Sequence, residues 1–190
     1  MQADRIYPPV QIWGSVRRTH ANQGTWAFYT HDYRFNALWG DPRPVVLSGA
    51  RVVVEPNFSC YSDTPLVVAL WRIYQKRWLA RFWQSQGMRI IVDLNVAPQF
   101  AEVNLLGVPK GWRIFSTRGY LLQVDQIERE YEIACNLAWP SLPLFYVYGG
   151  SQRLRAICET NGWHWLPERA DLVKAQRGVP VGVFAESHNG

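Results

Sequence analysis

The sequence predicts an α/β fold with a mostly parallel sheet built from βαβ units. The main evidence is the stretch of residues 51–95, which runs from a β-branched segment through a polar loop and a long helix to a second apolar segment. A strand, a crossover helix and a second strand form the βαβ unit, whose two strands lie parallel in one sheet. The same alternation continues to residue 166, so we expect an open sheet or a partial, barrel-like one.

A single domain with two extensions fits the chain length of 190 residues. Hydrophobic residues make up 48% of the chain and charged residues 18%, as in globular proteins. We expect the α/β domain to span residues 25–167. Residues 1–24 contain prolines and little periodicity, which indicates an irregular N-terminal arm. Residues 168–190 mix charges with glycine and proline, which indicates a loosely ordered C-terminal tail.

Short apolar runs bounded by turn residues define the individual elements. Pro56 ends one such run, and Gly87 is placed to end the long helix. In chain order, the expected extended segments cover residues 25–30, 45–47, 51–55, 89–94, 112–116, 144–148 and 163–167, and the expected helices cover residues 65–86, 99–106, 121–139 and 151–160. In the helix of residues 121–139, we expect Leu122, Ile127 and Tyr131 to face inward.

The helix expected over residues 65–86 is both aromatic and basic. On a helical wheel, six residues fall within an arc of about 140°, so we expect that arc to pack on the sheet; they are Val67, Trp71, Tyr74, Trp78, Leu79 and Phe82. The cations lie outside the arc, where they could contact phosphates while a ring stacks on a base. The alternative is a solvated basic face whose side-chain stems cover ring edges. The candidate nucleic-acid contacts are Arg72, Lys76, Arg77, Arg81 and Lys110, with Arg17, Arg18 and Arg34 as further arginines.

Composition points to an acidic partner and to the cytoplasm. Lys plus Arg number 20 against 15 for Asp plus Glu, which gives a net charge of +5 and favours partners such as nucleic acid. The three cysteines are widely spaced and form no CxxC pair, which argues against a disulfide framework and fits a reducing compartment. No apolar run approaches the length of a membrane span, and no signal peptide is recognisable.

Polar residues follow the expected strands at their carboxyl ends, where ligands bind in parallel α/β folds. The predicted pocket residues are Glu55, Asn57, Ser59, Asn95, Ser116, Thr117 and Tyr148. Asp63 and Asp93 are the candidate catalytic residues, and together with Glu55 they could hold Mg²⁺ to polarise a phosphodiester. Alternatively, Asp63 caps the long helix, Glu55 pairs with an arginine and Asp93 makes turn hydrogen bonds. The sequence contains no P-loop, GxGxxG or histidine zinc motif, so no other cofactor is expected.

Several short motifs in fixed order resemble an uncharacterised domain family of bacteria, plasmids and phages, DUF4417. The motifs are Asn57-Phe58-Ser59, Asp63-Thr64-Pro65, Trp71 with Tyr74, Arg77-Trp78, Trp83-Gln84, Gly107-Val108-Pro109-Lys110-Gly111 and Ser116-Thr117-Arg118-Gly119. The resemblance covers about residues 25–166. Its occurrence on mobile elements implies a role in nucleic-acid handling, element maintenance or host conflict. Family members often have an aspartate where this chain has Asn57, which argues against a metal ligand at that position.

Three functions remain open at this point. The first is a nucleic-acid-binding protein of a phage or plasmid, with the basic aromatic helix contacting phosphates. The second is a metal-dependent α/β enzyme that processes phosphodiesters at the strand ends. The third is a subunit whose aromatic surface docks on a partner protein. Charge and aromatic content favour the first.

Overall fold

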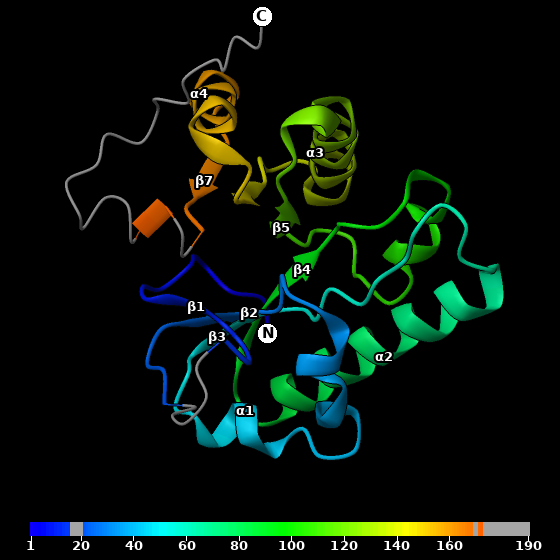
Figure 1. The fold of residues 1–190 in the computed structure, drawn as a ribbon, viewed down its shortest axis with the longest axis vertical. Helices are drawn as coiled ribbons and strands as arrows, with labels where there is room; N and C mark the ends of the chain where they lie inside the picture. The colour runs from blue at the N-terminus through cyan, green and yellow to red at the C-terminus, as the bar shows by residue number, and fades with distance from the viewer. Residues whose placement is uncertain (16–20, 169–170, 173–190) are drawn as a thin grey trace, which may run out of the picture.

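The structure is a computed structural model that describes residues 1–15, 21–168 and 171–172. Arg17, Arg18 and most of the expected C-terminal tail lie outside these residues. One parallel sheet contains the seven strands of the described chain, and their spatial order follows the sequence (Figure 1). The strands are β1 (Val10–Ile12), β2 (Thr25–Ala27), β3 (Val52–Val54), β4 (Arg89–Asp93), β5 (Ile114–Arg118), β6 (Leu144–Tyr148) and β7 (His164–Leu166). The predicted α/β class with a parallel sheet is confirmed.

The sheet is curled into a half-barrel. Neighbouring strands lie about 4.8 Å apart, so positions four strands apart in a flat sheet would be separated by about 19 Å. Yet the ring of Tyr29, just after β2, stacks on Tyr148 at the end of β6 with centroids 5.2 Å apart. The Tyr29 hydroxyl also lies 2.8 Å from Ser116 Oγ on β5. The curl therefore brings the carboxyl ends of distant strands together.

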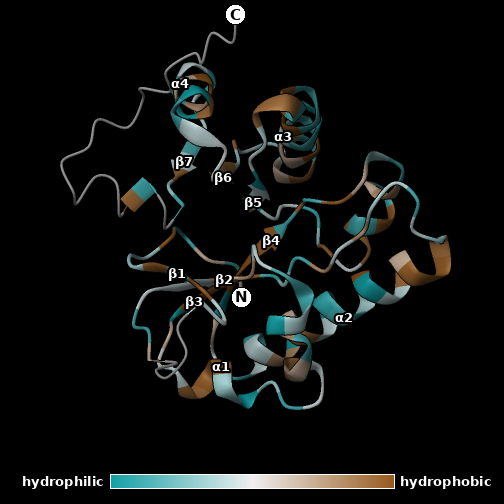
Figure 2. Ribbon diagram, viewed as in Figure 1, coloured by the Kyte–Doolittle hydropathy of each residue, from teal (hydrophilic) through white to brown (hydrophobic). Residues whose placement is uncertain are grey.

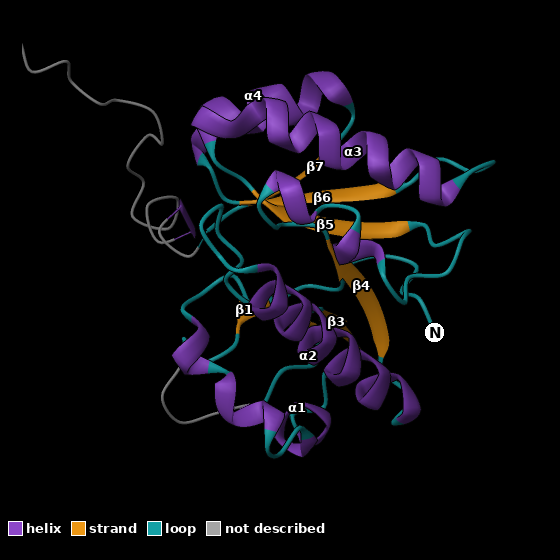
Figure 3. Cartoon of the chain, turned by 90° about the vertical axis from the view of Figure 1, so that its right-hand side faces the viewer, coloured by secondary structure: helices purple, strands orange, loops and turns teal. Residues whose placement is uncertain are grey.

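Helices cover the outer face of the half-barrel in two groups (Figure 3). The first group, α1 (Arg43–Leu47) and α2 (Leu66–Ser85), lies against the first strands of the sheet. The second group, α3 (Val124–Ala138) and α4 (Ser151–Asn161), lies against the last strands. Five 3-10 turns complete the described elements: η1 (Asp32–Arg34), η2 (Asn36–Trp39), η3 (Pro98–Phe100), η4 (Val103–Leu105) and η5 (Leu121–Gln123).

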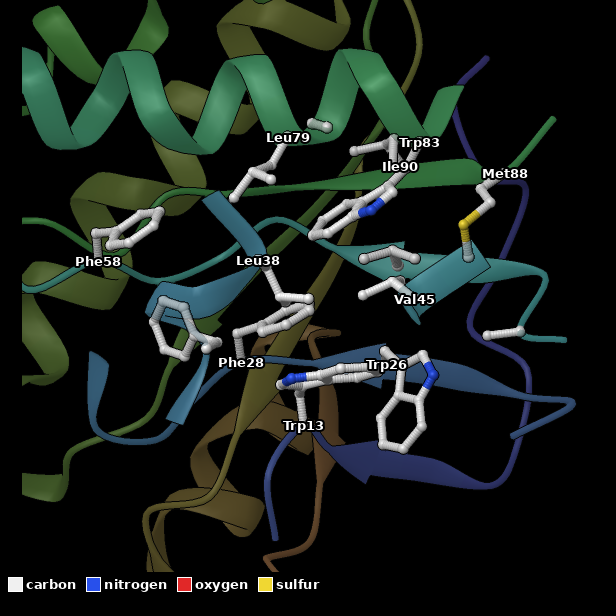
Figure 4. Packing of buried hydrophobic residues seen from close by; sticks show 14 residues of the cluster. Trp13, Trp26, Phe28, Leu38, Val45, Phe58, Leu79, Trp83, Met88 and Ile90 are labelled. Atoms are coloured by element: carbon white, nitrogen blue, oxygen red, sulfur yellow. The ribbon is translucent and has the colours of Figure 1, made fainter. Parts of the chain in front are cut away.

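The outer core beneath α2 is rich in large aromatic side chains (Figure 4). The rings of Phe28 and Trp83 stack with centroids 5.6 Å apart, and Trp83 Nε1 donates to Pro42 O at 3.0 Å. Trp13 meets Trp26 edge to face at 5.1 Å. Such rings bury large apolar areas, and edge-to-face pairs add to that stabilisation. A second outer core lies under α3 and α4, and a third cluster lines the inner face of the curled sheet.

The first 24 residues, expected to be irregular, contribute strand β1 and part of the inner core. Thr25 N donates to Pro9 O at 3.1 Å and Trp13 N donates to Ala27 O at 2.9 Å, which joins β1 to β2. Ala3 is buried in the inner cluster. A three-residue edge strand pairs with one neighbour and needs no apolar alternation of its own, so sequence patterning did not reveal it.

Three other local expectations are wrong. Residues 45–47 were expected to be extended, but they belong to helix α1. The helix expected over residues 99–106 is replaced by the separate turns η3 and η4. Leu122 was expected to face inward but is 98% exposed, because α3 begins only at Val124 and Leu122 lies in the preceding turn η5.

Helix α2 has the predicted length, but its inward face was predicted wrongly. Of the six residues in the expected apolar arc, Leu79 is buried, whereas Val67, Trp71, Tyr74 and Trp78 are exposed. The buried side instead carries Ala69, Ile73, Lys76, Ala80 and Trp83. Apolar residues occur all round this helix, so a helical wheel shows two apolar faces. The wheel alone therefore does not identify the face that packs on the sheet.

Candidate nucleic-acid interface and strand-end site

A buried polar network lies at the carboxyl ends of the strands, centred on Asp93. The hydroxyl of Tyr29 donates to Asp93 Oδ1 at 3.1 Å, and the amide of Asn57 donates to Asp93 Oδ2 at 3.0 Å. Lys76 Nζ lies 3.1 Å from the same Oδ2 and donates to Asp93 O at 2.9 Å. Asp93 is fully buried, and burial together with the charge of Asp93 raises the pKa of Tyr29 well above its usual range. Asn104 Nδ2 also donates to Asp93 O at 3.2 Å, while Asn104 Oδ1 is buried without a hydrogen-bond partner among the described residues. The network is therefore a buried part of the core in which one polar atom is left unsatisfied.

A second ion pair, between Glu55 and Arg77, lies beside the first. Glu55 Oε2 also accepts a hydrogen bond from Asp93 N at 3.1 Å, and Arg77 donates to the carbonyl oxygens of Asn104 and Leu106. Arg77 and Lys76 were candidate phosphate contacts. Their charges are balanced inside the protein, and Lys76 is buried, so neither presents an unpaired cation at the surface.

The three carboxylates considered for a magnesium ion do not form one group. Glu55 and Asp93 are buried and engaged with cations, whereas Asp63 lies exposed in the turn before α2. Among the described residues, no three His, Cys, Asp or Glu side chains are grouped so as to hold a metal ion. The structure also places Pro65 at the N-cap of α2 without a side-chain cap, so Asp63 does not cap the helix. The catalytic role of Asp63 and Asp93 stays a prediction.

Above the network, a cavity of about 620 Å³ opens at the strand ends. Three of the predicted pocket residues, Asn57, Ser59 and Asn95, line it. The other four do not line it: Glu55, Ser116 and Thr117 are buried, and so is Tyr148, which stacks on the cavity residue Tyr29. Aromatic and amide groups from other segments complete the lining; they include His31, Phe58, Tyr61, Tyr120, Gln123 and Gln126.

Glu130 is a functional candidate that sequence analysis missed. Its carboxylate accepts hydrogen bonds from the Thr117 hydroxyl and, at 3.0 Å, from the amide of Gln126, which lines the cavity. Burial raises the pKa of Glu130 to about 7, and the two hydrogen bonds limit that rise. A usable signal was present, because Glu130 shares the inward face of α3 with Ile127 and Ala134. A lone carboxylate on such a face indicates a special environment.

The outward side of α2 carries a cluster of half-exposed aromatic rings, which we call the aromatic ridge: Trp71, Tyr74, Trp78 and Phe82 of α2 with Trp39 of η2. Trp71 is 49% exposed, Tyr74 52% and Trp78 38%. Trp39 meets each of these three rings edge to face, at centroid distances of 5.2 to 6.0 Å. Exposed apolar residues continue to the first turn of α2, where Figure 2 shows hydrophobic colouring at the free end of the helix. Contiguous patches of this kind mark interaction sites.

Four candidate cations keep part of their side chains at the surface. Arg81 is exposed and donates to Gln84 Oε1 at 3.1 Å, and Lys110 is exposed in the loop before β5. Arg72 is half-buried, with its guanidinium 5.4 Å from the ring centre of the cavity residue Phe58. Arg34 is exposed and donates to Gly14 O at 2.9 Å. In the described chain, these residues have no carboxylate within ion-pair distance.

Comparisons with known proteins identify relatives in phages. The model of a family described as a domain of unknown function, DUF4417, matches residues 6–126. The chain is 31% identical over 91 residues to the Gene 1 protein of Mycobacterium phage D29, and 32% identical over 93 residues to that of Mycobacterium phage L5. These alignments cover 46% and 47% of this chain but only 34% and 41% of the relatives. No solved structure matches. Within the described residues, no helix combines the length and the apolar character needed to cross a membrane.

Proposed function

This chain belongs to the DUF4417 family, and we propose that it binds nucleic acid, with a single-stranded segment lying along the outward side of α2. The observation that supports this proposal is the combination of half-exposed rings and cations on one helix. Residues 66–85 include Arg72, Lys76, Arg77 and Arg81 but no acidic residue. Nucleic acid offers both bases that stack on rings and phosphates that attract cations.

The arrangement of the rings favours a single strand over a duplex. Trp71 and Tyr74 stack on each other with centroids 5.6 Å apart and planes 25° apart, and each is about half exposed, so a further planar group can reach them. Bases of a duplex are already stacked within the helix, whereas unpaired bases can lie on protein rings in a sequence-tolerant manner. We therefore expect the affinity for a single strand to depend only weakly on its base sequence.

The phosphate contacts in this proposal are few. Arg81 and Lys110 are exposed, and Arg72 is half-exposed, whereas Lys76 and Arg77 are already neutralised by carboxylates. Two or three neutralised phosphates correspond to a logarithmic salt slope of about −2 for a single strand. Such a slope is shallow, because few phosphates are neutralised. Much of the binding free energy would then come from stacking of bases on the rings.

The ridge can be tested by alanine variants and a labelled oligonucleotide. We expect Trp71→Ala and Tyr74→Ala each to weaken binding of a 20-nucleotide oligothymidine by roughly tenfold, because each lost stacking contact is worth about 1–3 kcal/mol. Fluorescence anisotropy measures the affinity. Trp139→Ala is the matched control, because Trp139 is also exposed but lies after α3, away from the ridge. Equal losses in the control and ridge variants would argue against this interface.

Docking of a partner helix is a second candidate function for the same surface. The exposed residues Val67, Trp71, Tyr74 and Trp78 follow each other at steps of four, three and four, which is the spacing of a seam between two helices. A second copy of the chain is the simplest such partner. Light scattering at increasing concentration tests it: association that Val67→Glu abolishes would support docking, and a monomer at every concentration would count against self-association.

A further inference from the structure

The cavity at the strand ends provides a site separate from the aromatic ridge. We infer that it binds a nucleoside monophosphate, with the base held between aromatic rings and side-chain amides and the phosphate next to Arg118. A volume of about 620 Å³ is within the range of small-molecule sites. Its position beyond the carboxyl ends of parallel strands is where such folds bind their ligands.

The charge of the lining fits a neutral ring that carries an anionic group. Within the described residues, the walls contain no carboxylate, and Arg118 supplies the permanent positive charge. Arg118 forms an ion pair with Glu168, with Nη2 2.6 Å from Oε1, and its guanidinium lies 5.6 Å from the ring centre of Tyr120. Unlike the buried Lys76, Arg118 lines the open cavity, so a ligand can reach it. A phosphate next to this guanidinium would share it with Glu168 by charge-assisted hydrogen bonds. A cationic ligand would meet no carboxylate in these walls.

The rings of the lining fit a planar heterocycle. Tyr61 is 67% exposed and Tyr120 is 47% exposed, so both keep ring surface for stacking. Phe58 is buried, and the guanidinium of Arg72 lies 5.4 Å from its ring centre. Aromatic side chains bind bases by stacking on their flat faces.

The amides of the lining fit the hydrogen-bonding edge of a base. Asn57 donates to Asp93 Oδ2 and to Asn95 O, and Asn95 Nδ2 in turn donates to Asn57 Oδ1 at 3.3 Å. Gln126 uses its amide nitrogen for Val96 O and Glu130 Oε1, both at 3.0 Å, and so offers its carbonyl oxygen as an acceptor. These contacts hold the amides in place before a ligand arrives, which lowers the entropic cost of binding. Donors and acceptors fixed in this way recognise a base edge.

Isothermal titration calorimetry with AMP, CMP, GMP and UMP tests the site directly. We expect at least one of the four to bind, and ribose 5-phosphate and inorganic phosphate to bind at least about tenfold more weakly, because they lack the base. Asn95→Leu and Tyr120→Ala should each weaken nucleotide binding by about tenfold through loss of a hydrogen bond and a stacking face. Both residues contact the cavity rather than the core, and thermal melting verifies that the variants fold.

Trp139→Ala is the control for the general effect of removing an exposed ring. It should leave mononucleotide affinity unchanged, because Trp139 lies after α3, belongs neither to the aromatic ridge nor to the cavity lining, and is exposed. The inference is overturned if the folded protein binds none of the four nucleotides at about 10 mM, a concentration beyond the weakest useful affinity. It is also overturned if ribose 5-phosphate binds as tightly as the nucleotides, or if the two cavity variants bind like the wild type. A failure of oligonucleotide binding at the ridge leaves these outcomes unaffected.

Discussion

The two sides of α2 reverse the usual distribution of polar and apolar side chains. The side against the sheet buries a charge, because Lys76 lies among Ile73, Ala80 and Trp83 and is only 2% exposed. The opposite side leaves Trp71, Tyr74 and Trp78 between 38% and 52% exposed. Burying those rings would be favourable and burying a lysine costs free energy unless it is paired. Two ion pairs, Lys76 with Asp93 and Arg77 with Glu55, therefore hold the inward side of α2 to the strand ends, whereas the outward side leaves aromatic rings exposed.

Removing the buried charge should have the largest effect. Lys76→Met leaves Asp93 buried with no cation at hydrogen-bond distance, so we expect the free energy of unfolding to fall by about 3–5 kcal/mol. Urea denaturation measures the change. Arg81→Met on the exposed side of the same helix is the matched control, and its effect should stay within about 0.5 kcal/mol. Similar values for the two variants would contradict the burial of Lys76.

Glu130, like Asp93, is a buried acidic residue, and its expected effect on stability is smaller than that of Lys76 and depends on pH. Folding raises the pKa of Glu130 from its ordinary value of 4.5 to about 7, so between these pH values the native state keeps a proton that the unfolded chain has lost. The resulting stabilisation is complete below pH 4.5 and is lost as the pH rises through about 7. The total loss is about 3 kcal/mol.

Substitution of Glu130 tests this pH dependence of stability. We expect Glu130→Gln to remove this part of the pH dependence, because an amide has no proton to lose in this range. Urea titrations between pH 5 and 8 measure it, and Glu128→Gln, at an exposed position of α3, is the control. Stability of the wild-type protein that stays constant over this range would show that the carboxyl group is not held neutral.

Elements that have a strong local pattern in the sequence were predicted correctly. Elements that depend on contacts with distant residues were missed. Strand β6 matches its predicted bounds, because a continuous apolar run between turn residues has few alternatives. Strand-end residues such as Asn57, Asp93 and Ser116 were predicted to lie near one another, and they join one hydrogen-bonded network. Strand ends meet at one edge in any parallel sheet, so this part needed no knowledge of side-chain positions.

The orientation of α2 could not be predicted for a physical reason. Both of its sides are apolar enough to pack on a sheet, and the choice depends on Asp93, a residue that meets Lys76 only after β4 is in place. The same reasoning explains why Lys76 and Arg77 were expected to contact phosphates. Their partners come from other strands, and a helical wheel contains no information about them.

A salt titration of single-stranded DNA binding tests the proposed interface on α2 directly. We predict that an oligothymidine binds at about 20 mM salt and that its affinity falls with a logarithmic slope of about −2, because two or three phosphates are neutralised. A 20-base-pair duplex should bind more weakly, since its bases cannot stack on Trp71 and Tyr74. Absence of any binding to the single strand at about 20 mM salt would contradict the proposed function.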